Sequence, residues 1–282
     1  MPPAWRIRDA ELPLGERTLL VGVVNVTPDS FSDGGEHPTK DTAVEHGITL
    51  LRDGADLLDV GGESTRPGAT PVAADEEARR VVPVVRALVE RGARVSVDTR
   101  KESVAREALA AGAHVINDIT GGRDPELLRA VAQAQAGLVI MHMQGEPGTM
   151  QQAPRYDDVV REVAAFLIER ARAAEAAGVA REAIALDPGI GFGKTVEQNV
   201  LLLRHVDAFR RLGHPILIGA SRKAFLGALT AEVGDVPPPG DRLEATLAAH
   251  LAARERGADV IRCHDVRAHR RAFLVADAVG RI

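Results

Sequence analysis

The sequence predicts a single-domain α/β protein, a TIM (β/α)8 barrel, on three observations. Short apolar runs rich in β-branched residues alternate with longer amphipathic stretches along nearly the whole chain, which is the pattern of repeated βα units. Eight such units fit into the 282 residues, close to the roughly 250 residues of a typical barrel. Several of the apolar runs end in polar side chains, where a barrel of this kind places its active site.

A doubly wound parallel sheet is the competing fold. It would favour a G-x-G-x-x-G sequence directly after the first strand, and that sequence is absent there. No linker or shift of composition marks a second domain, so we expect residues 19–282 to form one barrel. Residues 1–18 form a polar lead-in with prolines and the single tryptophan, Trp5, which we expect to form a short hairpin that closes one end of the barrel.

The strands are expected wherever a short apolar run occurs. The first, Leu19–Val24, is a continuous apolar run, as a strand buried on both faces requires. The others follow in order at Leu57–Gly61, Arg94–Asp98, His114–Asp118, Gly137–His142, Ile184–Asp187, Pro215–Gly219 and Val260–Cys263.

The stretches between the strands show helical spacing and helix-end signals. Ala74–Arg91 begins with three acidic residues, which suit the positive end of the helix dipole. Glycines follow the helices that end at Ala111 and Ala177, as C-terminal caps do. The helices are expected in order at Thr39–Asp53, Ala74–Arg91, Lys101–Ala111, Pro125–Gln135, Tyr156–Ala177, Val196–Leu212, Arg242–Arg256 and Arg267–Val279.

The composition limits the class of protein. Apolar residues make up 45% of the chain and charged residues 27%, as in ordinary globular proteins, and no apolar run approaches the ~20 residues of a membrane span. The net charge of −5 argues against a nucleic-acid or anionic membrane partner. The single cysteine, Cys263, excludes an intrachain disulfide and, with no signal-peptide pattern at the N-terminus, favours a cytoplasmic location.

Three acidic or amide side chains stand at the ends of predicted strands and together form the strongest candidate binding site. Asp98, Asn117 and Asp187 could each be explained alone, as a helix cap or an Asx turn. Because the carboxyl ends of barrel strands meet at one rim, we expect the three to lie together, and buried polar groups are costly unless paired. A small heterocycle with N–H donors is a natural partner. His142, at another strand end, is more typical of a packed core histidine.

Positive charges gather at the same predicted rim, at Arg66, Lys223, Arg262 and His264. Cations beside glycine-rich loops indicate a phosphate or diphosphate ligand. Asn25, which follows the first strand, offers an amide oxygen suited to Mg²⁺, an ion that uses few protein ligands and bridges phosphates.

The segment Gly189–Thr195 imitates a P-loop. Its G-x-x-x-G-K-T spacing is one residue short of the nucleotide-binding motif, and it follows the sixth strand. We therefore do not expect nucleotide hydrolysis.

Taken together, these segments resemble the dihydropteroate synthase family from about Leu19 to the C-terminus. The combination of motifs carries the resemblance, and the first two loops and the SRK segment are its most specific parts. The motifs are VNVTPDSFSDGG (Val24–Gly35), DVGGESTRPGA (Asp59–Ala69), VDTRK (Val97–Lys101), INDITGG (Ile116–Gly122), MHMQG (Met141–Gly145), DPGIGFGKT (Asp187–Thr195), GASRKAFLG (Gly219–Gly227) and RCHDV (Arg262–Val266).

The resemblance implies a folate-biosynthesis transferase on a pterin-binding TIM barrel, a homodimer of the kind that sulfonamides target. It would join 6-hydroxymethyl-7,8-dihydropterin diphosphate to 4-aminobenzoate, with Mg²⁺ as cofactor, and form 7,8-dihydropteroate and diphosphate. Its partners would be these small molecules, and no nucleic acid or membrane.

The resemblance also implies how the pterin is held. Asp98 would face a ring N–H and stabilise developing positive charge, Lys223 would donate to the pterin carbonyl, and Arg262 would stack its guanidinium on the ring. These three residues and His264 would be catalytic. The pterin would be bound by Asp98, Asn117, Met141, Asp187, Lys223 and Arg262.

The same resemblance implies residues for Mg²⁺, for the phosphates and for the aminobenzoate. Asn25 would bind Mg²⁺, and the first loop would bring in Phe31 and Asp33 as it closes over the site, so that the pterin binds first. The phosphates would lie near Thr65, Arg66 and His264, and the aminobenzoate near Arg66, Pro67, Phe192 and Ser221.

Two alternatives stay open. A corrinoid-linked methyltetrahydrofolate methyltransferase shares the barrel and the pterin-binding Asp/Asn set, but it needs neither Asn25 with Mg²⁺ nor the Thr65-Arg66 loop. A catalytically inactive pterin-binding barrel should have lost Lys223, Arg262 or His264, and all three are present.

Overall fold

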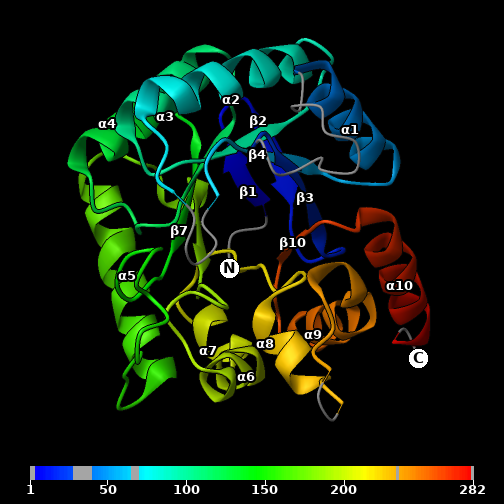
Figure 1. Ribbon diagram of the computed structural model, residues 1–282. Coiled ribbons are helices and arrows are strands. Elements are labelled where there is room, and N and C mark those ends of the chain that lie inside the picture. The colour runs from blue at the N-terminus through cyan, green and yellow to red at the C-terminus, as the bar shows by residue number, and fades with distance from the viewer. Residues whose placement is uncertain (1–3, 28–39, 65–69, 233–234, 281–282) are drawn as a thin grey trace.

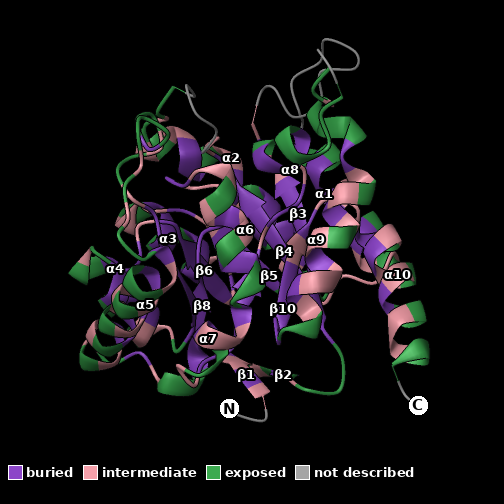
Figure 2. Ribbon diagram, turned by 90° about the horizontal axis from the view of Figure 1, so that it is seen from below, coloured by how far each residue is buried: buried purple, intermediate pink, exposed green. Residues whose placement is uncertain are grey.

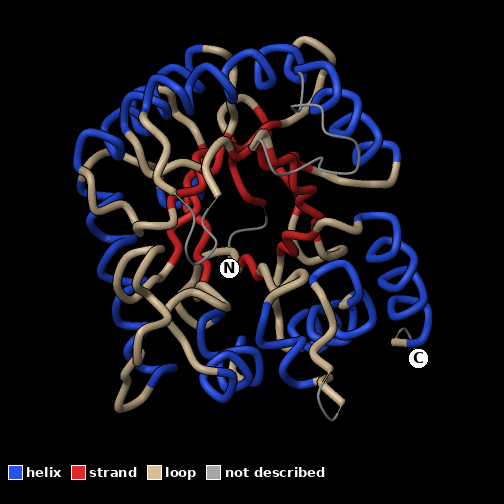
Figure 3. The backbone as a smooth tube through the Cα atoms, viewed as in Figure 1, coloured by secondary structure: helices blue, strands red, loops and turns tan. Residues whose placement is uncertain are grey.

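Eight parallel strands form the centre of the computed structural model, which describes residues 4–27, 40–64, 70–232 and 235–280. The strands lie in the order β8-β7-β6-β5-β4-β3-β10-β9, and a parallel bridge between Leu186 and Ile216 joins the two ends of this order. Figure 3 shows the resulting ring of strands inside a ring of helices. The strands are β3 (Leu19–Asn25), β4 (Leu57–Gly61), β5 (Val95–Asp98), β6 (Val115–Asp118), β7 (Gly137–Met141), β8 (Ile184–Asp187), β9 (Leu217–Ile218) and β10 (Val260–Cys263). The predicted barrel is therefore confirmed, and an open doubly wound sheet is excluded.

The helices surround the strands, and in most cases their bounds agree to within a few residues with those predicted from the sequence. They are α1 (Lys40–Arg52), α2 (Ala74–Val89), α3 (Glu102–Ala110), α4 (Pro125–Gln133), α5 (Val159–Ala176), α6 (Val196–Arg204), α7 (Val206–Arg210), α8 (Ala224–Leu229), α9 (Leu243–Glu255) and α10 (Val266–Val279), with short 3-10 turns at Arg181–Ala183 and Pro239–Asp241.

Three elements differ from the sequence prediction. The helix expected over Val196–Leu212 is divided at His205, whose φ of −116° and ψ of 32° are not helical. The seventh strand is shorter than Pro215–Gly219, because Pro215 has no N–H for the ladder and contributes only its carbonyl, which accepts from the Leu186 N–H at 2.9 Å. Helix α8 was not expected at all.

Inward-facing side chains form an apolar layer in the lower half of the barrel. Its members from the strands are Leu19, Val21, Leu57, Val115, Val139, Ala185, Leu217 and Val260. Since side chains alternate between the two faces of a strand, the residues two positions further along face the same way. Those residues include Asp59, Asn117, Met141, Asp187 and Arg262. The barrel is therefore apolar in its lower layer and mainly polar in the layer above it, at the carboxyl ends of the strands, which we call the mouth.

The hairpin expected in the lead-in is present and covers the lower end of the barrel (Figure 2). Strands β1 (Ala4–Ile7) and β2 (Ala10–Pro13) pair antiparallel. Trp5 is fully buried in the inner apolar layer, and its Nε1–H donates to the Ala183 carbonyl at 3.0 Å. The hairpin therefore excludes water from the end of the barrel opposite the polar mouth.

In the described part of the chain, no helix combines the length and apolarity that crossing a bilayer requires.

We expect Trp5→Ala to lower the free energy of unfolding by about 3–5 kcal/mol, because it removes the largest side chain of the inner layer. Trp5→Phe should cost less, since it keeps an aromatic ring and loses the hydrogen bond. Urea denaturation followed by far-UV circular dichroism measures both values. Glu11→Ala, on the exposed face of the same hairpin, is the control and should stay within about 0.5 kcal/mol of wild type. A loss of stability in both Trp5 variants as small as that of the control would show that Trp5 does not stabilise the barrel.

Candidate active site

A buried ion pair lies at the centre of the polar mouth. Asp59 Oδ2 accepts from Arg262 Nε at 2.6 Å and from Asn117 Nδ2 at 3.0 Å. Arg262 Nη2 also donates to Asp98 Oδ2 at 3.2 Å. These bonds join side chains from β4, β5, β6 and β10 at one point. Asp59 Oδ1 is buried and has no hydrogen-bond partner among the described residues, so one strong acceptor of the mouth lacks a protein donor.

Two carboxylates share one guanidinium in this cluster, and the shorter bond goes to Asp59. Burial and the Asp59 carboxylate raise the pKa of Asp98 from 3.8 to about 7, against the lowering effect of Arg262. For Arg262, burial lowers the pKa, but the carboxylates of Asp59 and Asp98 outweigh it and the pKa is raised. Arg262 is therefore charged, while Asp98 exchanges its proton near neutral pH.

Asp187 and Lys223 lie at the same mouth and act on one another. Burial raises the pKa of Asp187 from 3.8 to about 6, and Lys223 opposes this rise. Burial and the charge of Arg262 lower the pKa of Lys223 from 10.5 to about 8, while Asp187 and Asp98 raise it. The Asp187 Oδ1 atom accepts from the Gly189 N–H at 2.7 Å, which fixes the carboxylate at the end of β8.

The register of the barrel places further predicted residues beside these groups. Asp98 is the direct partner of Asn117 across β5 and β6, and Met141 is the partner of Asp187 across β7 and β8. Met141 belongs to a small apolar cluster at this end of the barrel, and Phe192 packs against that cluster. The Lys223 Nζ atom lies 3.8 Å from the centroid of the Phe192 ring. The mouth therefore has an apolar wall beside its charged groups.

Ser221 and His264 form a pair at the ends of β9 and β10. Ser221 Oγ and His264 Nδ1 are 2.9 Å apart, and the His264 N–H donates to the same Ser221 Oγ at 3.3 Å. Ser221 is buried and His264 is half-buried. Both side chains thus occupy fixed positions at the rim next to Arg262.

Lys194, in the segment that imitates a P-loop, points into the protein. Its Nζ donates to the carbonyl oxygens of Gly189 and Phe192 at 2.9 and 2.8 Å and lies 3.0 Å from His142 Nδ1. Burial lowers the pKa of Lys194 to about 7 and, with the Lys194 charge, that of His142 to about 3. A side chain at Gly189 would meet the His142 carbonyl. This lysine and these glycines therefore build the loop instead of holding a phosphate.

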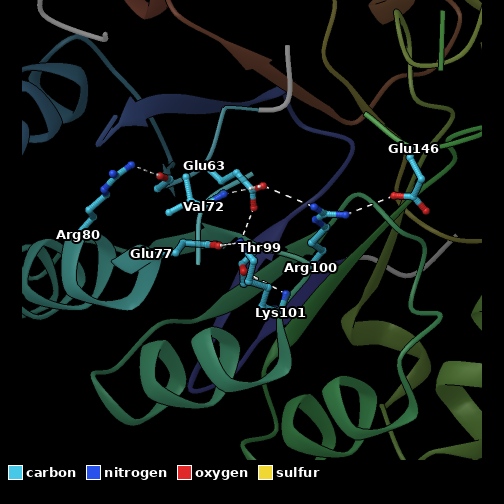
Figure 4. A network of polar contacts seen from close by, with 9 residues as sticks. Glu63, Val72, Glu77, Arg80, Thr99, Arg100, Lys101 and Glu146 are labelled. Atoms are coloured by element: carbon cyan, nitrogen blue, oxygen red, sulfur yellow. Dashed lines mark hydrogen bonds and ion pairs between the residues drawn. The ribbon is translucent and has the colours of Figure 1, made fainter. Parts of the chain in front are cut away.

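A second charged network fixes the start of the loop after β4 (Figure 4). Lys101 forms ion pairs with both Glu63 and Glu77, and Glu77 is almost fully buried. Arg100 bridges Glu63 and Glu146 at 3.5 and 3.3 Å. Loops that follow β4, β5 and β7 are thus tied together at the rim. A cavity there is lined by Glu63, Ser64, Glu77, Asp98, Thr99, Arg100, Ile119 and Pro147.

Sequence reasoning missed Asp59 and the Glu63–Lys101–Glu77 network. The available signal for Asp59 was a carboxylate inside the otherwise apolar strand β4, where a charge needs a buried partner. The sequence around Glu77 gave no distinguishing signal. Glu77 is one of three acidic residues in the first turn of α2, and this pattern resembles a solvated helix start.

Several predicted residues cannot be placed. Phe31, Asp33, Thr65, Arg66 and Pro67 lie outside the described residues. The metal prediction falls on a residue that is described.

Asn25, the predicted metal ligand, ends β3 and is half-buried. It is the direct partner of Gly61 on β4. The described residues contain no group of three or more His, Cys, Asp or Glu side chains suited to a metal ion. A single amide oxygen nevertheless fits an ion that takes most of its ligands from water and substrate phosphates.

Comparison with known proteins identifies relatives over nearly the whole chain. The family described as pterin binding enzyme matches residues 21–264. The dihydropteroate synthase of Escherichia coli strain K12 is 46% identical over 260 residues, which cover 92% of this chain and 90% of that protein. The family match therefore includes every strand end described above.

Solved structures give the same answer. The dihydropteroate synthase of Xanthomonas albilineans, solved with 4-aminobenzoic acid, has a TM-score of 0.92 and 48% identity, and the match covers 100% of both chains. A complex from the same organism with 7,8-dihydropteroate has a TM-score of 0.89 and 46% identity, and covers 99% of this chain and 100% of that chain.

We expect the contribution of Asp98 to the free energy of unfolding to fall as the pH rises from about 4 to about 7, whereas the histidines whose pKa burial lowers act in the opposite direction. The folded state holds the Asp98 proton up to about pH 7, whereas the unfolded chain releases it near the ordinary value of 3.8, so folding takes up a proton in this window. The slope from one such group is at most about 1.4 kcal/mol per pH unit. Asp98→Asn removes this group, so the free energy of unfolding measured by urea denaturation at pH 5, 6 and 7 should change more positively with pH in the variant than in wild type.

The matched control is Asp207→Asn, on the exposed surface of α7, which should leave the slope unchanged. Asp187 and the buried histidines also change protonation on folding in this window, but they are common to all three proteins. Superimposable pH profiles for wild type and Asp98→Asn would contradict the raised pKa.

Proposed function

The chain belongs to the dihydropteroate synthase family of pterin-binding enzymes, and from this premise we propose which of its residues carry the reaction. The enzyme condenses 6-hydroxymethyl-7,8-dihydropterin diphosphate with 4-aminobenzoate and releases 7,8-dihydropteroate and diphosphate. The bond between the pterin methylene carbon and the diphosphate oxygen breaks, and a bond from that carbon to the aromatic amine forms. The observation that supports our assignment is the meeting of Asp98, Asn117, Arg262 and Lys223 in one mouth.

The edge of the pterin would bind to Asp187, Asn117 and Lys223. With a pKa of about 6, Asp187 is mainly a carboxylate at neutral pH and can accept from the amino group and a ring N–H. The Asn117 amide already donates to Asp59, which leaves its carbonyl oxygen for a second N–H of the ring. Lys223, mainly protonated below its pKa of about 8, would donate to the pterin carbonyl.

The face of the pterin would lie against Arg262. A guanidinium stacks well on flat rings, but a positive charge near the reacting carbon opposes the charge that develops there as diphosphate leaves. Asp59 and Asp98 both bind this guanidinium, so its charge is compensated from below. The carboxylate form of Asp98 would then stabilise the cationic carbon, which is the main contribution of a preorganised site to such a reaction.

The leaving group would meet His264 together with Thr65 and Arg66, and the aminobenzoate would meet Phe192, Ser221, Arg66 and Pro67. Phe31 and Asp33 would contribute from the first loop. The aromatic amine is already a nucleophile, so its attack requires no strong base. We expect sulfonamides to compete at the aminobenzoate subsite.

Asn25 would hold Mg²⁺ through its amide oxygen. When bound, the ion supplies positive charge to the phosphate oxygens that leave. The half-buried position of Asn25 beside Gly61 supports this assignment.

A second copy of the chain is the proposed partner, and the outer face of α10 is the proposed contact. Leu274, Val275 and Val279 are all more than half exposed; Val275 and Val279 are four residues apart on one face of the helix, and Leu274 lies at the edge of that face. Burying this face against another copy would remove three apolar side chains from water. A cytoplasmic location stays the proposal for such a biosynthetic enzyme.

We expect Asp187→Asn and Lys223→Ala each to weaken binding of the pterin diphosphate at least tenfold, or about 1.4 kcal/mol. Each substitution removes one charge that faces the pterin edge. Isothermal titration calorimetry without aminobenzoate measures the effect. The matched controls are Asp207→Asn, whose side chain is half exposed, and Lys40→Ala at an exposed position. Affinities equal to those of the controls would remove both residues from the pterin subsite.

Diphosphate release tests the function itself. It should require the pterin diphosphate, 4-aminobenzoate and Mg²⁺ together, and chelation of the ion should abolish it. Asn25→Ala should raise the Mg²⁺ concentration for half-maximal release about tenfold, because one protein ligand is lost. An unchanged Mg²⁺ dependence would exclude Asn25 as the ligand, and release without aminobenzoate would indicate a different reaction.

A further inference from the structure

The turn between β9 and α8 carries Ser221 and Lys223 on either side of a residue with an unusual backbone. Arg222 has a φ of +60°, a left-handed conformation that is unfavourable for residues other than glycine. Such a conformation persists only where its surroundings hold it in several ways at once.

Three contacts hold Arg222 from outside the turn. Its N–H donates to Thr246 Oγ1 at 3.1 Å, and its carbonyl accepts from Arg242 Nη1 at 3.0 Å. Its guanidinium makes a two-pronged ion pair with Asp265 at 3.1 and 2.7 Å. The turn is therefore fixed by α9 on one side and by the end of β10 on the other.

A chain of two buried histidines makes a second link between the same places. The Ala220 N–H donates to His250 Nε2 at 2.9 Å. His250 Nδ1 lies 2.8 Å from His269 Nε2, and His269 Nδ1 lies 2.8 Å from the Asp265 carbonyl oxygen. Neither ring has any exposed surface.

The two ends of this chain determine where every proton in it lies. A backbone N–H can only donate, so His250 Nε2 must accept and the proton of that ring sits on Nδ1. His250 Nδ1 then donates to His269 Nε2, which leaves the His269 proton on Nδ1. That proton meets a carbonyl oxygen, which can only accept. Both rings are therefore neutral, in agreement with the lowered pKa that burial gives each of them.

The relay ends directly behind the proposed reaction site. Ala220 precedes Ser221 and Asp265 follows His264, and Ser221 and His264 are themselves hydrogen-bonded. Helices α8, α9 and α10 lie next to one another along this side of the barrel (Figure 1). The relay and the Arg222–Asp265 ion pair thus connect the same two strand ends from behind.

We propose that His250 and His269 are positioning residues for the transfer reaction: as a neutral relay with one fixed direction, they hold Ser221, on the aminobenzoate side, at a set distance from His264, on the diphosphate side. This proposal rests on the proposed function, which assigns those two sides. The relay touches no reacting atom. Its effect is to align the nucleophile with the leaving group.

The first test compares two substitutions at His269. His269→Phe keeps a ring of similar size but removes both hydrogen bonds of the relay, whereas His269→Gln can accept from His250 and donate to Asp265 with one amide. We expect His269→Phe to lower kcat for diphosphate release tenfold or more, and to leave the affinity for pterin diphosphate alone within twofold. His269→Gln should restore kcat to within threefold of wild type.

The matched control is His214→Phe. His214 is as deeply buried as His269, and neither of its ring nitrogens has a hydrogen-bond partner among the described residues. This variant should keep kcat within twofold of wild type. If circular dichroism shows that His269→Phe does not fold, His250→Leu is used in its place, because it breaks the relay at the other ring. An equal kcat for the Phe and Gln variants would overturn the proposal.

A second measurement reports on the relay without using activity. Nitrogen-15 NMR of labelled wild-type protein at pH 7 should show both rings as neutral Nδ1–H tautomers, whereas histidines that are merely buried have no required tautomer. An Nε2–H ring at either position would overturn the proposal. Failure of the wild-type enzyme to release diphosphate would instead refute the proposed function, and the NMR result would still decide whether the relay exists.

Discussion

The contact between Asp59 and Arg262 is the constraint on which the mouth of the barrel depends. It joins two strands that are 203 residues apart in sequence and places a full ion pair where apolar side chains fill most barrels. Such a pair is expensive to bury and is tolerated only when its remaining donors and acceptors are used. Asn117 and Asp98 use some of them, whereas one Asp59 oxygen has no partner among the described residues. The cluster therefore fixes the plane of the guanidinium and remains open to a ligand.

This arrangement is possible because stability and chemistry occupy different layers of the barrel. The inner apolar layer and the hairpin around Trp5 close the lower end, so the upper layer does not need to be apolar. The residues of the upper layer stand on the same strands, two positions further along. A ligand at the mouth would thus rest on a rigid floor, and charge placed there would be shielded from water by the protein below it.

The rim shows the same division, between side chains proposed to contact ligands and side chains that fix those contacting residues in place. Lys101 links Glu63 and Glu77 under the loop after β4, and Lys194 ties together the carbonyls of the loop after β8. The His250–His269 pair does the equivalent work behind Ser221 and His264. Each of these groups fixes a loop start, which is what a reaction without a strong base requires, since its rate depends on where charges stand when the leaving group departs.

The sequence by itself determined the fold and the main membership of the mouth. Alternation of apolar runs with amphipathic stretches predicts a parallel barrel, and a closed parallel barrel must bring the carboxyl ends of its strands together, so Asp98, Asn117 and Asp187 could be grouped from their positions alone. Lys223, Arg262 and His264 could be added in the same way, from their positions at the same predicted rim. Only the tertiary structure decided which of these groups pair with one another, that Asp59 is the centre of the cluster, that Lys194 faces inward and that a histidine relay supports the Ser221–His264 pair. The physical reason is that periodicity fixes the direction of a side chain relative to its own strand or helix, whereas hydrogen bonds and ion pairs depend on distances across the closed barrel, which no local pattern contains.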